Sequence, residues 1–173
     1  DCEVGASVHK LAFDLFLGWS GLKSILRRCF DIVHGHMHEG AFIGHVLSRL
    51  MRVPLLFDFQ GSLTGEMIDH HFLDPQGPWY YWLRLLEQRI NRMPDVIVTS
   101  SRRGASLLME DFNCSEQTVQ PLPDCVGLDF FRPDVLSPAV VAKRKTALGV
   151  PLGRPVIVYL GLLADYQGTP QLI

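Results

Sequence analysis

Polar side chains that could bind a ligand or move a proton follow several short apolar runs of this chain. In an open parallel sheet, ligands bind beyond the carboxyl ends of the strands. If the apolar runs are parallel strands, these side chains converge on one wall of a cleft. The candidate cleft-lining residues are His36, His38, Glu39, Gly40, Asp58, Gln60, Gly61, Ser101, Arg102 and Asp124.

Three of the histidines alternate along the chain, as His34, His36 and His38. In an extended segment their rings would share one face, and His-x-His is a pattern that binds first-row metals, which would indicate a metal-dependent hydrolase. If a strand instead ends near His36 and a helix begins at Gly40, the rings point in different directions. His38 or Glu39 could then meet a sugar or a phosphate at the N-terminus of that helix. The histidines could also be purely structural.

The second apolar run ends in Asp58, Gln60 and Gly61. Gly61 would let another group approach the backbone closely. Asp58 could contact a ligand or serve only as a helix N-cap or loop acceptor. Arg102 falls in the first turn of a predicted helix, where a cation is unfavourable with the helix dipole. Its place there indicates either an anionic ligand or a solvated surface.

The segments around these candidates alternate between strand and helix patterns. Strands are predicted at 31–34, 53–59, 95–99 and 118–122, and helices at 9–30 (one or two, because Gly18 and Gly21 interrupt it), 40–51, 65–71, 79–93 and 101–112, the last with Ser101 as its N-cap. Apolar strands separated by crossover helices are typical of a parallel sheet covered by helices. We therefore predict a doubly wound α/β domain with a Rossmann-like parallel sheet.

Three further segments shape the predicted organisation. Residues 61–78 form a Gly-, Pro- and His-rich connection, and long loops of this kind are often functional. Residues 133–150 predict a surface linker that ends in a short helix, and residues 155–163 predict another apolar strand. We place a domain boundary in this linker.

Composition limits the classes of partner. The 173 residues are 47% hydrophobic and 20% charged, which predicts a folded core, and the net charge of −2 gives no basic field for nucleic acid. Four scattered cysteines predict reduced thiols and a cytoplasmic location.

No apolar run reaches the roughly 20 residues of a membrane span. Lys23, Arg27 and Arg28 indicate either a basic helix on a membrane surface or the solvated face of a packed helix.

Motifs of several common enzyme classes are absent from the sequence. There is no G-x-x-x-x-G-K-[ST] phosphate loop, no G-x-G-x-x-G fingerprint, no H-E-x-x-H and no G-x-S-x-G. The usual nucleotide triphosphatase, dehydrogenase, zincin and esterase interpretations therefore lose their main support.

Residues 31–173 resemble the family 4 glycosyltransferases of the GT-B type, in which two Rossmann-like domains face each other across a cleft. The most specific match is VQPLPDCVGLDFFRP at 119–133, which is similar to the P-N-G-V-D…F-x-P segment where the two halves of these enzymes meet. Further matches are DIVHGH at 31–36, VPLLF at 53–57 and DVIVTSS at 95–101. Residues 155–168 resemble the opening strand of the donor-binding half. In the family this strand is followed by a Gly and, a little later, by Lys-Gly.

The resemblance implies transfer of a sugar, with retention of configuration, from a nucleotide-diphosphate sugar to a glycan, lipid-linked or small-molecule acceptor, with no bound cofactor or metal. Residues 1–135 would form a partial acceptor-side domain, 136–153 a linker with a short helix, and 154–173 the start of the donor-binding domain. The partner of this chain would be the rest of the donor-binding domain, and the isolated chain is expected to be inactive. The residues that would lie near the donor phosphates are Gly161, Leu162, Gln167 and Gly168.

The chain departs from the family pattern at several of these positions. Gln60 stands where the family commonly has His, Leu162 and Gln167 stand where it has cations, and Asp124 replaces Asn. A non-catalytic α/β module that binds a sugar or nucleotide is therefore the alternative function, and the metal-dependent hydrolase remains a third. Peripheral contact with a membrane is compatible with each of them.

Overall fold

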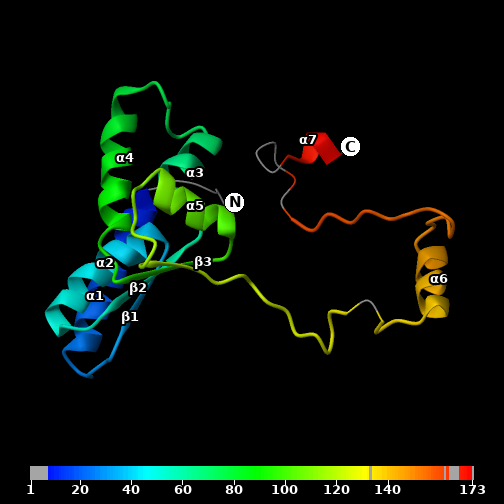
Figure 1. Ribbon diagram of the computed structural model, residues 1–173, viewed down its shortest axis with the longest axis horizontal. Coiled ribbons are helices and arrows are strands. Elements are labelled where there is room, and N and C mark those ends of the chain that lie inside the picture. Colours follow the sequence, from blue (N-terminus) through cyan, green and yellow to red (C-terminus); the bar gives the residue numbers. More distant parts are fainter. Residues whose placement is uncertain (1–7, 133, 162, 164–167, 173) are drawn as a thin grey trace. The chain divides into compact units, whose positions relative to one another are not determined.

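The computed structural model describes residues 8–132, 134–161, 163 and 168–172 (Figure 1). The chain divides after Pro123 into two compact units. In its described residues the second unit contains helix α6 (Pro138–Ala147) and the short helix α7 (Thr169–Leu172).

The first unit is a four-stranded parallel sheet with flanking helices. Its strands are β1 (Val33–His36), β2 (Leu55–Phe59), β3 (Val96–Thr99) and β4 (Val119–Pro121), and its helices are α1 (Val8–Ile25), α2 (Met37–Met51), α3 (Leu63–Asp69), α4 (Pro78–Asn91) and α5 (Arg102–Glu110). The strands lie in the order β1-β2-β3-β4, and every neighbouring pair is parallel. The predicted Rossmann-like α/β class is confirmed.

Strand β2 supplies the centre of the core. Leu55, Phe57 and Phe59 are buried, whereas the residues between them are only partly covered. This alternation sends the two phenylalanine rings to one face and Asp58 to the other. Burying each ring contributes about 1.5–3 kcal/mol, so a shift of the strand by one residue would be strongly unfavourable. The core therefore fixes which side chains stand at the end of β2.

Helix α2 begins three residues earlier than predicted, at Met37 rather than Gly40, and follows β1 directly. Met37 makes the turn with a left-handed φ of 59°. Gly35 allows the strand and the helix to approach closely, because a Cβ at this position would lie 2.7 Å from the carbonyl oxygen of Gly40. His38 and Glu39 are consequently placed in the first turn of α2.

Helix α1 is a single helix that runs through both of its glycines. A Cβ at Gly21 would lie 2.6 Å from a methyl carbon of Leu47 in α2, so the glycine permits close packing of the two helices. None of the helices in the described part of the chain is both long and apolar enough to cross a membrane.

The strand predicted at 155–163 is wrong in its described part, because residues 155–160 have no strand pairing. Ile157 and Leu160 are 79% and 91% exposed. A parallel strand needs a neighbour to bond its N–H and C=O groups. Among the described residues of the second unit no strand offers such a neighbour, so the local apolar pattern does not produce a strand.

Cys114 provides a check on the first unit. Its thiol is buried and donates to the backbone oxygen of Asn91 at 3.5 Å, and burial raises its pKa, with Arg92 opposing the shift. A raised pKa leaves less reactive thiolate at pH 8. We expect iodoacetamide to label Cys114 at least tenfold more slowly than the exposed Cys29 and Cys125, as measured by peptide mass spectrometry. Equal rates in native buffer would contradict the fold at this position, and equal rates in urea are the control.

Candidate functional site

The carboxyl ends of β1 and β2 carry a hydrogen-bonded chain of three side chains. His36 stands opposite Asp58 in the parallel register, so both side chains leave the sheet on the same side. Nδ1 of His36 lies 2.8 Å from Oδ2 of Asp58, and Nε2 of Gln60 donates to Oδ1 of Asp58 at 2.6 Å. With Nδ1 as the donor, Nε2 of the His36 ring is the acceptor nitrogen. The structure therefore brings His36, predicted at the end of the first apolar run, together with Asp58 and Gln60, predicted at the end of the second.

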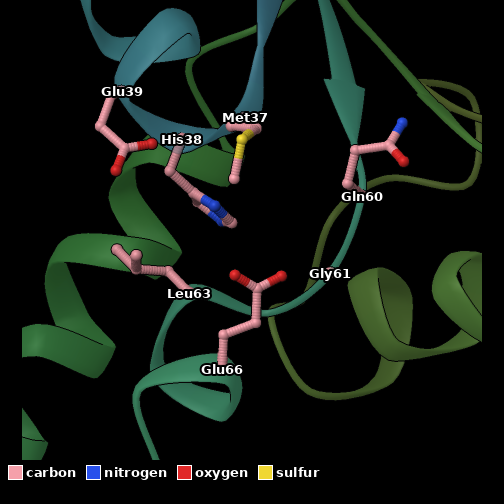
Figure 2. Close-up of a pocket in the computed structure, with 7 residues that line it drawn as sticks. All are labelled: Met37, His38, Glu39, Gln60, Gly61, Leu63 and Glu66. Atoms are coloured by element: carbon pink, nitrogen blue, oxygen red, sulfur yellow. The ribbon is translucent and has the colours of Figure 1, made fainter. Parts of the chain in front are cut away.

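A small pocket lies next to these three hydrogen-bonded side chains, between the first turn of α2 and the segment that follows β2 (Figure 2). Figure 2 shows the ring of His38 and the carboxylate of Glu66 pointing into the same space. Four of the predicted residues line the pocket, and Met37, Leu63 and Glu66 are additions to the predicted set. The lining residues are Met37, His38, Glu39, Gln60, Gly61, Leu63 and Glu66.

Gly61 admits the side chain of Glu66 to this pocket. A Cβ at Gly61 would lie 2.9 Å from Oε1 of Glu66, so a larger residue here would displace the carboxylate from its present position. The pocket has a volume of about 20 Å³, which is space for about one water molecule. It can therefore take a single hydroxyl or water-sized group, whereas a whole sugar would have to lie outside it.

A buried carboxylate, Glu87 of α4, lies behind this pocket and was missed by the sequence analysis. It is fully buried, and its oxygens accept the backbone N–H groups of Leu63 at 2.8 Å and Thr64 at 3.1 Å. His38 Nε2 lies 3.7 Å from Oε1 of the same carboxylate. The available signal was helical phase, because Glu87 precedes the buried Ile90 by three residues and so lies on the buried face of α4.

The three alternating histidines do not form one cluster. His34 and His36 are exposed on β1, whereas His38 is buried in α2 with its ring edge-on to Phe57 and Phe59 at centroid distances of 5.4 and 5.7 Å. Within the described ranges, no group of three or more His, Cys, Asp or Glu side chains is arranged to hold a metal ion. The geometry therefore does not support the arrangement on which the metal-dependent hydrolase depended.

Other predicted residues have structural positions. Ser101 is the N-cap of α5, as predicted, and its hydroxyl accepts the N–H of Gly104 at 3.0 Å. Arg102 is exposed in the first turn of α5. Gly40 faces Gly35 where α2 packs on β1. Of these three, only Arg102 has a side chain that is both charged and accessible to an anion.

The remaining candidates lie outside the first unit. Asp124, Gly161 and Gly168 lie in the second unit. Leu162 and Gln167 fall outside the described residues. The assignment of Asp124 to the cleft wall, and of the other four residues to a donor-phosphate site, stays a prediction.

Together, the fold and the site define an α/β protein of the Rossmann-like class whose polar side chains gather at the carboxyl ends of parallel strands. A family model described as "Glycosyl transferase 4-like domain" matches residues 4–125. The chain belongs to this family.

Two curated relatives carry the name D-inositol 3-phosphate glycosyltransferase. The one from Corynebacterium glutamicum is 22% identical over 172 residues, covering 98% of this chain and 40% of the relative. The one from Corynebacterium aurimucosum is 25% identical over 150 residues, covering 84% of this chain and 35% of the relative. The chain thus spans about two fifths or less of the length of these relatives.

A solved structure supports the fold. The crystal structure of the Anabaena protein HepE in complex with UDP superimposes with a TM-score of 0.55 at 12% sequence identity, covering 79% of this chain and 32% of that protein. At this level of identity the likeness concerns the fold alone.

Proposed function

We propose that the chain is the acceptor-side part of a glycosyltransferase that transfers a hexose, with retention of configuration, from a nucleotide-diphosphate sugar to an acceptor hydroxyl. The observation that carries the proposal is the hydrogen-bonded chain of His36, Asp58 and Gln60, located at the carboxyl ends of parallel strands in a glycosyl transferase 4-like domain. Such strand ends are the usual ligand-binding edge of an α/β sheet. The names of the curated relatives and the UDP in the HepE structure support this class of reaction.

The geometry gives His36 a specific task. Asp58 accepts a hydrogen bond from Nδ1 and holds the ring, so Nε2 can accept a hydrogen bond from the acceptor hydroxyl and orient its oxygen toward the anomeric carbon of the donor. The new bond forms between that oxygen and the anomeric carbon, while the bond from the anomeric carbon to the diphosphate breaks. The electron pair of the breaking bond stays on the diphosphate, so negative charge develops there, where Arg102 or backbone amides can stabilise it. The hydroxyl proton passes from the acceptor to the leaving diphosphate oxygen.

The pocket of about 20 Å³ suits one further hydroxyl of a polyol acceptor. Its lining offers the Gln60 amide and the carboxylates of Glu39 and Glu66, all of which form hydrogen bonds to hydroxyl groups. We propose no metal and no bound cofactor for this reaction, in keeping with the family resemblance. The acceptor would be a glycan, a lipid-linked sugar or a small polyol.

We assign residues 1–135 to the acceptor-side domain, 136–153 to the linker and 154–173 to the start of the donor-binding domain. A nucleotide-sugar donor favours a cytoplasmic location. The absence of a disulfide at Cys29, Cys114 and Cys125, the cysteines that the structure describes, favours it as well. A chain that spans two fifths of its relatives supplies only part of such an enzyme, so we expect residues 1–173 alone to be inactive.

The test compares residues 1–173 with the complete reading frame that contains them. Both proteins are incubated with UDP-glucose and other nucleotide sugars plus a panel of polyol acceptors, and the release of nucleotide diphosphate and the anomer of the product are measured. Transfer by the complete protein with retained configuration is the expected result. Tight nucleotide-sugar binding without transfer would favour the non-catalytic binding module, and an inverted product would refute the retaining mechanism.

We also propose peripheral contact with a membrane through α1. Phe13, Phe16 and Trp19 are each more than half exposed on this helix, and Lys23 lies 5.2 Å above the Trp19 ring. Exposed aromatic side chains beside a cation suit the interface of an anionic bilayer. Vesicles containing phosphatidylglycerol should therefore sediment the protein, whereas vesicles of phosphatidylcholine alone should bind it less.

Replacing both Phe13 and Phe16 with Ser should lower this vesicle binding roughly tenfold or more. The matched control replaces both Phe130 and Phe131 with Ser, which removes two exposed rings (81% and 70%) from the second unit. Unchanged binding by the double variant would argue against contact through α1.

A further inference from the structure

We propose that Glu87 is a positioning residue that holds the two walls of the pocket in their relative places. This inference rests on the proposed function only for its consequence in transfer, because the positioning itself is a structural claim. One wall is the first turn of α2, which carries His38, and the other is the segment of residues 61–66, which carries Gly61 and Glu66. Glu87 contacts both walls from α4.

The contacts to the second wall use both carboxylate oxygens. Oε1 accepts the N–H of Leu63 at 2.8 Å, and Oε2 accepts the N–H of Thr64 at 3.1 Å and also the Thr64 hydroxyl. Ser62 accepts the next free N–H, that of Gly65, at 3.1 Å. The backbone at the start of α3 is therefore fixed from a helix more than twenty residues further along the chain.

The contact to the first wall is the approach of His38 Nε2 to Oε1 of Glu87 at 3.7 Å. His38 is buried against the rings of Phe57 and Phe59, so it cannot follow a displaced carboxylate into solvent. Arg84 Nη1, 3.6 Å from Oε2, supplies positive charge to the buried carboxylate. A fully buried carboxylate is tolerated only with such partners. Two of the partners of Glu87, His38 and the backbone at Leu63 and Thr64, belong to the two walls of the pocket.

The conservative substitution Glu87→Gln separates positioning from simple packing. The side chain keeps its size, but one oxygen becomes an NH₂ group that cannot accept a backbone N–H. At least one N–H of Leu63 or Thr64 then loses its acceptor. In the folded variant we expect amide hydrogen exchange at these two residues to accelerate at least tenfold while exchange of the Ile97 amide in β3 is unchanged. The ring resonances of His38 should shift in ¹H–¹⁵N spectra.

Two controls address general destabilisation and nonspecific charge loss. Ile97→Val lowers stability in the core without contacting the pocket, and Glu110→Gln removes an exposed carboxylate from α5. Neither should move the exchange rates at Leu63 and Thr64 or the His38 resonances. If Glu87→Gln fails to fold, Thr64→Val removes one partner of the carboxylate and should still shift the His38 ring, which lies on the opposite wall.

In the complete protein, Glu87→Gln should raise KM for the acceptor about tenfold with a smaller change in kcat. Unchanged exchange at Leu63 and Thr64, exchange accelerated equally throughout the unit, or an unshifted His38 ring in Thr64→Val would each overturn the inference. If the wild-type protein transfers no sugar, the proposed function fails, but the exchange and ring measurements still decide the role of Glu87.

Discussion

Gly35→Ala is expected to destabilise the first unit by about 3 kcal/mol, near the upper end of what overpacking costs. The added Cβ would lie 2.7 Å from the carbonyl oxygen of Gly40 and 2.8 Å from both N and Cα of Ala41. These are backbone atoms, so no side-chain rotation can relieve the contact. Helix α2 would have to move away from β1, and its first turn carries His38 into the pocket.

Urea unfolding followed by circular dichroism measures this effect as a lower midpoint at constant slope. The matched control is Gly18→Ala in α1, where a Cβ would meet only a methyl carbon of Ile43 at 3.8 Å. This control should be neutral or stabilising by roughly 0.5–1 kcal/mol, because Ala is the better helix former. Equal midpoints for wild type and Gly35→Ala would contradict the close approach of β1 and α2.

His36→Ala is expected to lower kcat/KM for sugar transfer by the complete protein about 100-fold, because a reacting oxygen that is no longer held in orientation loses about this much rate. The substitution removes Nε2, the nitrogen that we assign to the acceptor hydroxyl. Stability should change little, because the His36 side chain is 62% exposed. The loss should appear mainly in kcat, since the rest of the acceptor can still bind.

His34→Ala is the matched control, because His34 is also exposed on β1 and lies two residues from His36. It should leave transfer within about twofold of wild type, well under the 1.36 kcal/mol that a tenfold change represents. Asp58→Asn should produce a loss of roughly tenfold, because the ring keeps its place but loses the carboxylate that fixes its tautomer. Equal activities of the two histidine variants would refute the role of His36.

Local sequence patterns were sufficient for most of the first unit. The runs at 53–59 and 95–99 predicted β2 and β3 to within two residues, because buried apolar and β-branched residues favour strands wherever they are covered. Ser101 was recognised as an N-cap because its hydroxyl competes for the free N–H groups of a helix start. These signals act over a few residues and can be read directly.

Two local interpretations failed where neighbours decide the outcome. The apolar pattern of residues 155–163 resembled a strand, but its described part has no partner to pair with. The start of α2 was placed at Gly40, whereas the left-handed φ of Met37 turns the chain into the helix three residues earlier. A left-handed methionine has no sequence signature, because glycine and asparagine are the residues expected there.

The sequence by itself determined that this protein is an α/β domain with parallel strands, that polar residues follow those strands, and that the chain resembles a glycosyltransferase family. Only the tertiary structure decided how these residues combine. The pairing of His36 with Asp58 depends on strand register, the separation of His38 from the other histidines depends on the early start of α2, and Glu87 reaches the pocket from α4. Contacts between residues distant in the chain are set by packing of the whole core, which no local pattern encodes.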